Sequence, residues 1–225
     1  MKFKKKYLSL FPLLFVGLLN VIFYFQEEQI LKVITSILLV PTFLYYYRSE
    51  VKQPRIFLQI AFLFSWIGDV VFLFNDRDVF VKISVVCYFL TQLFLILEVR
   101  KQIKSFHYRF LSMGVLLFAS YLVIFLNQIY IYLGDMKVYS IIYGLTISYL
   151  GCISLMYFFQ KQSKHRFFLF FGVLLYSFRD VLLTYNVKFF HREVFTHTVA
   201  LLYLAALFFI TRFFIYEPHP NHRHE

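Results

Sequence analysis

Two aspartates stand inside apolar runs that are long enough to cross a membrane. Asp69 lies in LFSWIGDVVFLFND, residues 63–76, and Asp180 lies in LLYSFRDVLLTYN, residues 174–186. An ionised side chain at such a depth costs roughly 3 kcal/mol on insertion scales, so it is retained only with a partner or a function. Paired carboxylates can serve as a general acid and a general base, so both residues are candidates for acid–base chemistry.

The elements that position these acids are predicted to be membrane-spanning helices. Of the 225 residues, 60% are hydrophobic and only 16% are charged, whereas a soluble domain is about half apolar and a quarter charged. The short connections leave no room for a separate soluble unit, so residues 1–225 are predicted to form a single integral membrane domain. Apolar runs of about 20 residues predict an all-α, polytopic helical bundle with eight transmembrane helices: Tyr7–Phe25, Ile30–Tyr47, Ile56–Phe74, Val79–Leu97, Phe110–Leu133, Val138–Phe159, Phe167–Tyr185 and Val194–Tyr216.

The positive charges alternate from one connection to the next. Sixteen Lys and Arg residues fall at the N-terminus, in the second, fourth and sixth connections and at the C-terminal end, against four in the remaining connections. This positive-inside bias predicts that both termini are cytoplasmic in a membrane such as the bacterial inner membrane. The bias also accounts for the net charge of +11, so no nucleic-acid partner is predicted. The oligomeric state stays open.

The two aspartates are expected to share one depth in the membrane. Asp69 follows Arg55 by fourteen residues, and Asp180 follows Arg166 by fourteen. At about 1.5 Å per residue this is roughly 21 Å from the cytoplasmic boundary, in the outer third of the membrane.

A short local match links the two aspartate segments. DVVFLFN at residues 69–75 aligns with DVLLTYN at 180–186, and Ser65 and Ser177 stand just upstream. The matched helices are four apart, which indicates a parallel 4+4 repeat of two four-helix units. Such a repeat would bring Asp69 and Asp180 to related positions around a shared cavity.

A few other polar residues fall in the same outer third. Lys32, Lys82 and His197 lie near the outer starts of the second, fourth and eighth helices. The two lysines can lift their ammonium groups into the headgroup layer. Arg179 lies deeper, and because neighbours on a helix point about 100° apart, it need not pair with Asp180 and can face Asp69 or an anionic ligand. A buried ion-pair network that only holds the helices together is the structural alternative.

The sequence predicts no metal and no organic cofactor. Cys87 and Cys152 both lie within spans, where they behave as small apolar residues, and their spacing fits neither a disulfide nor a metal site. The histidine-containing tail EPHPNHRHE, residues 217–225, could bind a metal but is more typical of a solvated tail.

Four segments resemble successive signature stretches of one family. They are LKVITSILLVP, FSWIGDVVFLF, YGLTISYLG and GVLLYSFRDVLLTY, and they resemble the YhhN-type integral membrane proteins, whose characterised members are lysoplasmalogenases. The most specific parts are the Gly68–Asp69 pair and the Ser-x-x-Asp of Ser177 and Asp180. The chain departs from the family pattern at three positions. Pro, His and Gln are frequent there, whereas this sequence has Val33, Gln92 and Ala206, respectively.

The resemblance implies a hydrolase that acts on a lysophospholipid in the lipid bilayer. Its substrate would be a lysoplasmalogen, whose vinyl-ether bond is cleaved to a fatty aldehyde and a glycerophospho-alcohol. Vinyl ethers hydrolyse by protonation of the outer alkene carbon, which forms an oxocarbenium ion that water captures. Paired carboxylates can supply both the acid and the base, as in glycosidases. Asp69 has no adjacent cation and is assigned as the acid and Asp180 as the base, with the reverse assignment left open.

The remaining candidates are expected to bind the substrate. Arg179, Lys32 and Lys82 would hold the phosphate. The other predicted substrate-binding residues are Ser65, Ser177, Tyr176 and His197.

A second class of function stays open. Intramembrane acids in a repeat also suit a proton-coupled or lipid transporter. Turnover in detergent discriminates between a hydrolase and a transporter, because transport needs two compartments.

Overall fold

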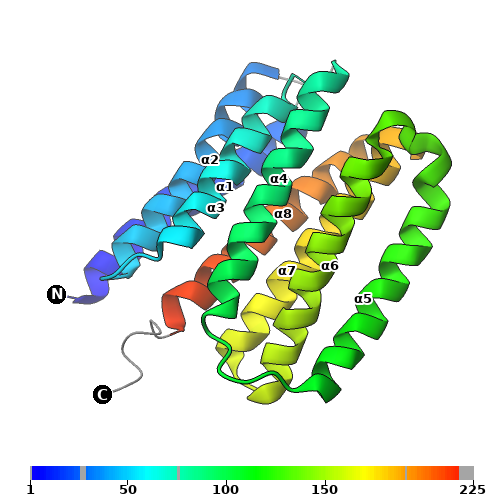
Figure 1. The fold of residues 1–225 in the computed structure, drawn as a ribbon. Coiled ribbons are helices and arrows are strands. Elements are labelled where there is room, and N and C mark those ends of the chain that lie inside the picture. The colour runs from blue at the N-terminus through cyan, green and yellow to red at the C-terminus, as the bar shows by residue number, and fades with distance from the viewer. Residues whose placement is uncertain (1, 26–28, 75–76, 191, 218–225) are drawn as a thin grey trace.

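The chain folds into helices that lie side by side along one direction (Figure 1). The computed structural model describes residues 2–25, 29–74, 77–190 and 192–217, and these form no strand. The helices are α1 (Lys2–Phe25), α2 (Gln29–Glu50), α3 (Ile56–Phe72), α4 (Asp78–Arg100), α5 (Tyr108–Ile129), α6 (Lys137–Gln160), α7 (Lys164–Tyr185) and α8 (Glu193–Tyr216), with a 3₁₀ segment η1 (Tyr130–Met136) and a π-helical turn η2 (Asn186–Phe190). The all-helical prediction is confirmed.

The predicted fifth span ends four residues beyond the end of the observed helix. The apolar run continues to Leu133, but α5 ends at Ile129 and the chain continues as η1. Within η1, Gly134 adopts φ 50°, a left-handed conformation that a side chain disfavours. The run therefore ends in a turn because of backbone geometry that hydropathy does not report.

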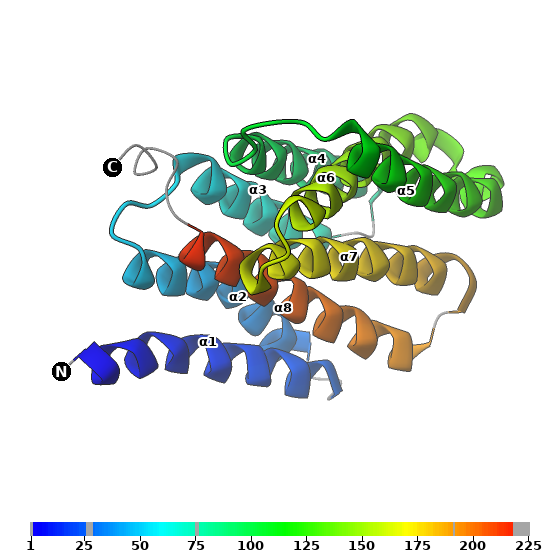
Figure 2. The same ribbon diagram turned by 90° about the horizontal axis from the view of Figure 1, so that it is seen from below.

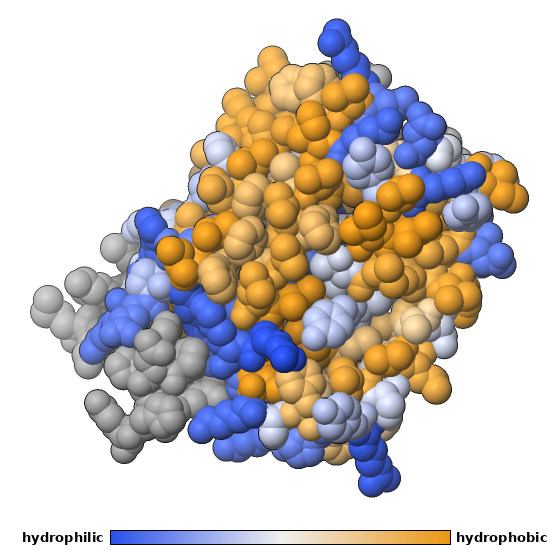
Figure 3. Space-filling view, in the orientation of Figure 1, coloured by the Kyte–Doolittle hydropathy of each residue, from blue (hydrophilic) through white to orange (hydrophobic). Residues whose placement is uncertain are grey.

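Several helical stretches are long and apolar enough to cross a membrane. In the described part of the chain these are Asp78–Arg100, Tyr108–Gln160, Lys164–Tyr185 and Val194–Tyr216, the second of which contains α5, η1 and α6. On the face seen in Figure 3, apolar side chains cover the middle of the bundle and hydrophilic ones gather toward its ends. Length, composition and this surface indicate a membrane protein.

Consecutive helices pack as hairpins. The closest pairs are α1 with α2, α3 with α4, α5 with α6 and α7 with α8. Contacts of α4 with α6, and of α8 with α1 and α2, join the first half of the chain to the second. Figure 2 shows α1 and α5 on opposite sides of the bundle, with α7 and α8 between them. The start of α1 and the end of α8 lie at one end of the bundle, which we call the terminal end, and the opposite end is the far end (Figures 1 and 2).

Buried polar contacts close the terminal end. Arg55 Nη1 lies 3.3 Å from Glu98 Oε1, and each side chain is 2% exposed. Arg55 Nη2 also donates to the Glu217 carbonyl at 2.6 Å, and the Tyr157 hydroxyl donates to Glu217 Oε1 at 2.6 Å. We call Arg55, Glu98, Tyr157 and Glu217 the closing network. It ties the start of α3 to α4, to α6 and to the end of α8.

Gly114 lets α5 approach the backbone of α6 closely. A Cβ atom built at Gly114 would lie 3.0 Å from Cys152 Cα and 3.1 Å from the Cys152 carbonyl oxygen. These are backbone atoms, which cannot rotate away as a side-chain tip can.

Gly114→Ala is expected to lower the free energy of unfolding by about 1–3 kcal/mol, because the added methyl forces α5 away from α6. Thermal unfolding of the detergent-purified protein measures the change. Ala119→Leu, at an exposed position of α5, is the control and should leave the transition where it is. Equal transitions for Gly114→Ala and the parent protein would show that the two helices can separate without loss.

Candidate functional site

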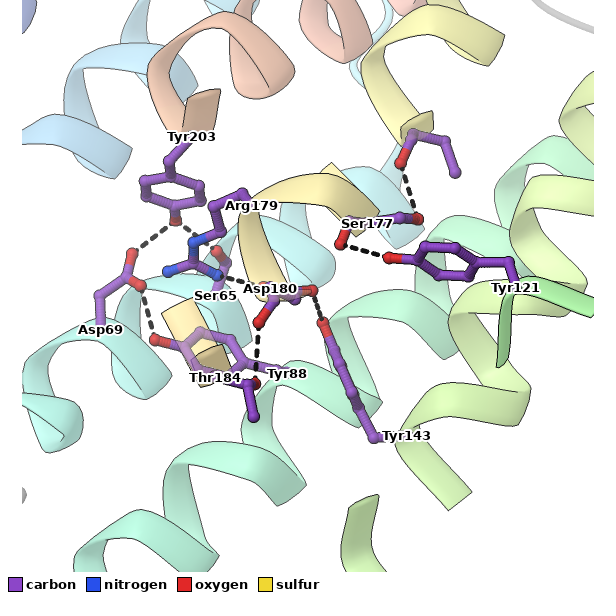
Figure 4. Close-up of polar contacts among 11 residues, drawn as sticks. Ser65, Asp69, Tyr88, Tyr121, Tyr143, Ser177, Arg179, Asp180, Thr184 and Tyr203 are labelled. Carbon is purple, nitrogen blue, oxygen red and sulfur yellow. Dashed lines mark hydrogen bonds and ion pairs between the residues drawn. The ribbon is translucent and has the colours of Figure 1, made fainter. Parts of the chain in front are cut away.

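Asp69 lies near the far end of α3 and accepts hydrogen bonds from two tyrosines (Figure 4). Tyr88 of α4 donates to Oδ1 at 2.8 Å, and Tyr203 of α8 donates to Oδ2 at 2.5 Å. The Ser65 hydroxyl, one turn earlier on α3, lies 2.9 Å from the Tyr203 hydroxyl. Tyrosines from two other helices therefore hold this carboxylate.

Gly68 makes room for one of these tyrosines. A Cβ atom at Gly68 would come within 2.9 Å of Tyr88 Cε1. The Tyr88 ring thus lies directly against the α3 backbone, beside the carboxylate of Asp69. This contact gives a physical reason for a glycine next to the aspartate.

Asp180 lies on α7 and is also held through both oxygens. Tyr143 of α6 donates to Oδ2 at 2.5 Å, and Arg179 Nη1 lies 2.9 Å from Oδ1 (Figure 4). Arg179 therefore pairs with its neighbour in sequence, an arrangement that helix geometry alone did not require. The Arg179 side chain is 7% exposed and that of Asp180 is 19% exposed, so the carboxylate is the more accessible partner.

Arg179 joins the two carboxylates into one cluster. Its Cζ atom lies 4.5 Å from the ring centre of Tyr203, 5.5 Å from that of Tyr88 and 5.6 Å from that of Tyr176. Aromatic faces attract a guanidinium at these distances, and two of the three rings donate their hydroxyls to Asp69. We use the name acid cluster for Asp69, Asp180, Arg179, Tyr88, Tyr143 and Tyr203. It contains two carboxylates and one guanidinium.

The structure brings some of the other predicted residues to the acid cluster. Ser65 reaches it through Tyr203, as described above. The Tyr176 ring meets the Tyr203 ring edge to face at 6.0 Å. Ser177 is buried one turn before Asp180 on α7, but its hydroxyl donates to the Val173 carbonyl at 3.0 Å. Ser177 therefore supports the backbone of α7 in this conformation.

The structure places one of the two predicted lysines away from the acid cluster. Lys82 Nζ lies 3.9 Å from Oδ2 of Asp135, whose side chain is 93% exposed, so Lys82 is directed to the surface. His197 is partly buried on α8. Lys32 belongs to α2, but its side chain falls outside the described part of the structure.

Three buried polar groups near the cluster form no hydrogen bond within the described residues. They are the Tyr176 hydroxyl, Arg179 Nε and the side-chain amide of Gln92, which lacks a partner at both Nε2 and Oε1. Buried polar groups are nearly always satisfied, so such groups often mark the place of a ligand or a bound water.

No group of three or more His, Cys, Asp or Glu side chains with metal-binding spacing occurs in the residues that the structure describes. Cys87 and Cys152 are buried free thiols. The histidine tail is predominantly within residues 218–225, outside the described residues.

Sequence reasoning missed the tyrosines that hold the acids. The chain contains 18 tyrosines, so residue type alone does not single out Tyr88, Tyr143 or Tyr203. One pattern could have found Tyr88: Ser84, Tyr88 and Gln92 recur every four residues within an apolar helix, which places polar groups along one face.

The comparisons with known proteins identify a family. The model of the YhhN family matches residues 28–214, a stretch that contains every residue of the acid cluster. No curated protein and no solved structure matches the chain.

Proposed function

Since the chain belongs to the YhhN family, we propose that it is a membrane hydrolase that cleaves the vinyl-ether bond of lysoplasmalogens. The products are a fatty aldehyde and a glycerophospho-alcohol. The observation that carries the proposal is the acid cluster, in which α3 and α7 supply two carboxylates to one site inside an apolar bundle. That site offers two carboxylates for the acid and base roles of vinyl-ether hydrolysis, and a cation that can bind the phosphate.

Asp69 is the proton donor in this proposal. Its hydrogen-bond partners, Tyr88 and Tyr203, are neutral, and it forms no ion pair with any described residue. Its proton passes to the outer alkene carbon of the substrate, and the electrons of the double bond form the new C–H bond. The carbon attached to oxygen becomes an oxocarbenium ion. The nearby carboxylate of Asp180 stabilises this cation.

Asp180 is the base. Its ion pair with Arg179 compensates the charge of the carboxylate. Asp180 takes a proton from water while the water oxygen bonds to the oxocarbenium carbon. The hemiacetal then collapses: its hydroxyl proton returns to Asp69, its bond to the glycerol oxygen breaks, and that oxygen takes the proton from Asp180. The cycle balances and regenerates both groups without a cofactor.

The anionic headgroup is proposed to approach from the far end. Arg179, with its buried Nε free of a hydrogen bond in the described residues, would bind the phosphate. Ser65, Tyr176 and Ser177 come before the acids on α3 and α7, so they lie on the terminal-end side of the acids and not on this path. The starts of α2, α4 and α8 lie at the far end, and there Lys32, Lys82 and His197 would form an outer ring for the headgroup. Apolar side chains of the bundle would contain the single alkenyl chain.

Release of aldehyde from a lysoplasmalogen by the purified protein in detergent tests this function. Transport needs two compartments and detergent provides none, so turnover would exclude the alternative of a proton-coupled or lipid transporter. A purified, monodisperse protein that releases no aldehyde, but moves protons or lipid in sealed vesicles, would overturn the proposal.

Arg179→Gln is expected to lower kcat by roughly 10²-fold, because Asp180 loses the charge that compensates its carboxylate. If Arg179 also binds the phosphate, KM should rise by the equivalent of about 1.5–3 kcal/mol. Steady-state kinetics of aldehyde release separates the two effects. Arg109→Gln, the same change at an exposed position at the start of α5, is the control. A kcat equal to the parent value in Arg179→Gln would contradict the pairing role.

We further propose that all of α1 to α8 span the bacterial inner membrane, with both termini cytoplasmic and the halves α1–α4 and α5–α8 related as a parallel repeat. Support comes from the start of α1 and the end of α8, which lie at one end of the bundle (Figure 1), and from Asp69 and Asp180, which lie on the third helix of each half. Alkaline phosphatase fusions should be active at Glu27 and Asp76 and inactive at Lys52 and Lys101. The opposite pattern would invert the topology.

A further inference from the structure

Gln92 is a buried amide for which the proposed mechanism has no use. The residue is 1% exposed on α4, and neither Nε2 nor Oε1 has a hydrogen-bond partner in the described part of the protein. An amide buried without partners costs free energy that a leucine of similar size would not. A buried amide of this kind often marks the position of a small polar ligand.

Gln92 lies next to the acid cluster. It follows Tyr88 by one turn, about 6 Å along α4, and residues four apart share a face of a helix. Tyr88 donates to Asp69 at 2.8 Å. Side chains on a helix tilt toward the N-terminus of that helix. The N-terminus of α4 lies at the far end. The Gln92 side chain, which starts on the terminal-end side of the acid cluster, is therefore tilted toward the cluster.

Tyr176, on α7, is a second buried polar residue beside the acid cluster. It precedes Asp180 by one turn and is 2% exposed. Its hydroxyl lies near the Ser65 side chain but forms no hydrogen bond of ordinary geometry with a described residue. Its ring lies 5.6 Å from Arg179 Cζ and 6.0 Å from the Tyr203 ring, so its place beside the cluster is set by packing. Because α7 runs toward the far end, Tyr176 is also on the terminal-end side of the acids.

We infer that Gln92 and Tyr176 hold the water molecule that is consumed in the reaction. The inference rests on the proposed function, which requires a water within reach of Asp180 in an apolar bundle. Together the amide and the hydroxyl offer donors and acceptors, and a buried water makes about three hydrogen bonds. Water is then held on the terminal-end side of the acids, while the lipid headgroup approaches from the far end.

Competition between water and methanol tests this site. Methanol that captures the oxocarbenium ion forms a methyl acetal, which has no hydroxyl proton to lose and therefore does not collapse to aldehyde. The acetal-to-aldehyde ratio, measured by mass spectrometry in a fixed methanol–water mixture, reports how well the site selects water.

Gln92→Leu and Tyr176→Phe are each expected to raise this ratio and to lower kcat by up to about 100-fold, because the water is no longer positioned. KM for the lipid should change little. Gln92→His, which keeps a donor and an acceptor, should restore part of the selectivity. The matched control is Thr211→Val, which removes a buried hydroxyl that also lacks a partner in the described residues, about 12 Å along α8 from Tyr203. Its ratio should equal that of the parent protein.

The thermal transition gives a second readout. Gln92→Leu should keep or raise the melting temperature, because no hydrogen bond to another described residue is lost. An unchanged product ratio and kcat in both Gln92→Leu and Tyr176→Phe would overturn the water site, as would a ratio that rises equally in Thr211→Val. If Gln92→Leu does not fold, Tyr176→Phe decides by the same measurement. A parent protein that forms neither product would instead refute the proposed function.

Discussion

Asp69→Asn and Asp180→Asn are each expected to lower kcat by about 10²–10⁴-fold, the usual effect of removing a general acid or base. Asparagine keeps the size of the side chain and can still accept one tyrosine hydrogen bond through its carbonyl oxygen. Its NH2 group can donate to the oxygen of a second hydroxyl, so the acid cluster should stay folded. Aldehyde release by purified variants measures the effect. Asp135→Asn, at a side chain that is 93% exposed, is the matched control and should retain parent activity.

The same pair of variants separates catalysis from a structural role. Parent-like turnover in either variant would refute the two-carboxylate mechanism. Failure of both variants to purify as monodisperse protein, with Asp135→Asn intact, would show that the cluster is an ion-pair network whose task is to hold the helices together.

Glu98→Gln is expected to destabilise the protein by about 3–5 kcal/mol, because it breaks a buried ion pair and leaves Arg55 without its carboxylate. Arg55→Gln should cost less, because Lys101 Nζ still lies 3.6 Å from Glu98 Oε2. Each side chain is 2% exposed, so water cannot replace the lost contact. The double variant Arg55→Met with Glu98→Leu should recover part of the loss, since neither charge then remains buried. Thermal unfolding in detergent compares the variants.

The control for the closing network is Lys82→Gln, which breaks the surface pair with Asp135. Exposed pairs contribute about 0–1 kcal/mol, so this transition should move little. Transitions of Arg55→Gln and Glu98→Gln that coincide with that of Lys82→Gln would show that the closing network adds nothing to stability.

Helices were predictable from the sequence because length and hydropathy determine them. The predicted third span, Ile56–Phe74, and the observed helix, Ile56–Phe72, differ by one half-turn. The ends of the helices were less predictable where the backbone conformation determines them, as near Gly134. Eight membrane spans and the repeat stay predictions.

The site was predictable only for its charged members. An aspartate in an apolar run stands out, and Asp69 and Asp180 were found in this way. Tyr88 and Tyr203 did not stand out, because the sequence does not distinguish a tyrosine that only packs in an apolar helix from one whose hydroxyl binds a carboxylate. Arg55 was assigned to a connection, where it counted toward the positive-inside bias. Its burial against Glu98 depends on tertiary packing of α4 that no local pattern reports.

The hairpin arrangement bears on how the carboxylates enter a membrane during synthesis. Helices that are made first can pack against each other before later helices exist. Tyr88 lies on α4, the hairpin partner of α3, which carries Asp69. Asp180 enters with Arg179 on its own helix, and Tyr143 on α6 has already been made. Each acid thus acquires a hydrogen-bond donor as its own hairpin or helix forms, so neither has to wait for the complete bundle. Tyr203 arrives with α8, which follows α3 and α7 in the chain, so the newly made chain completes the cluster only after α8 has been added.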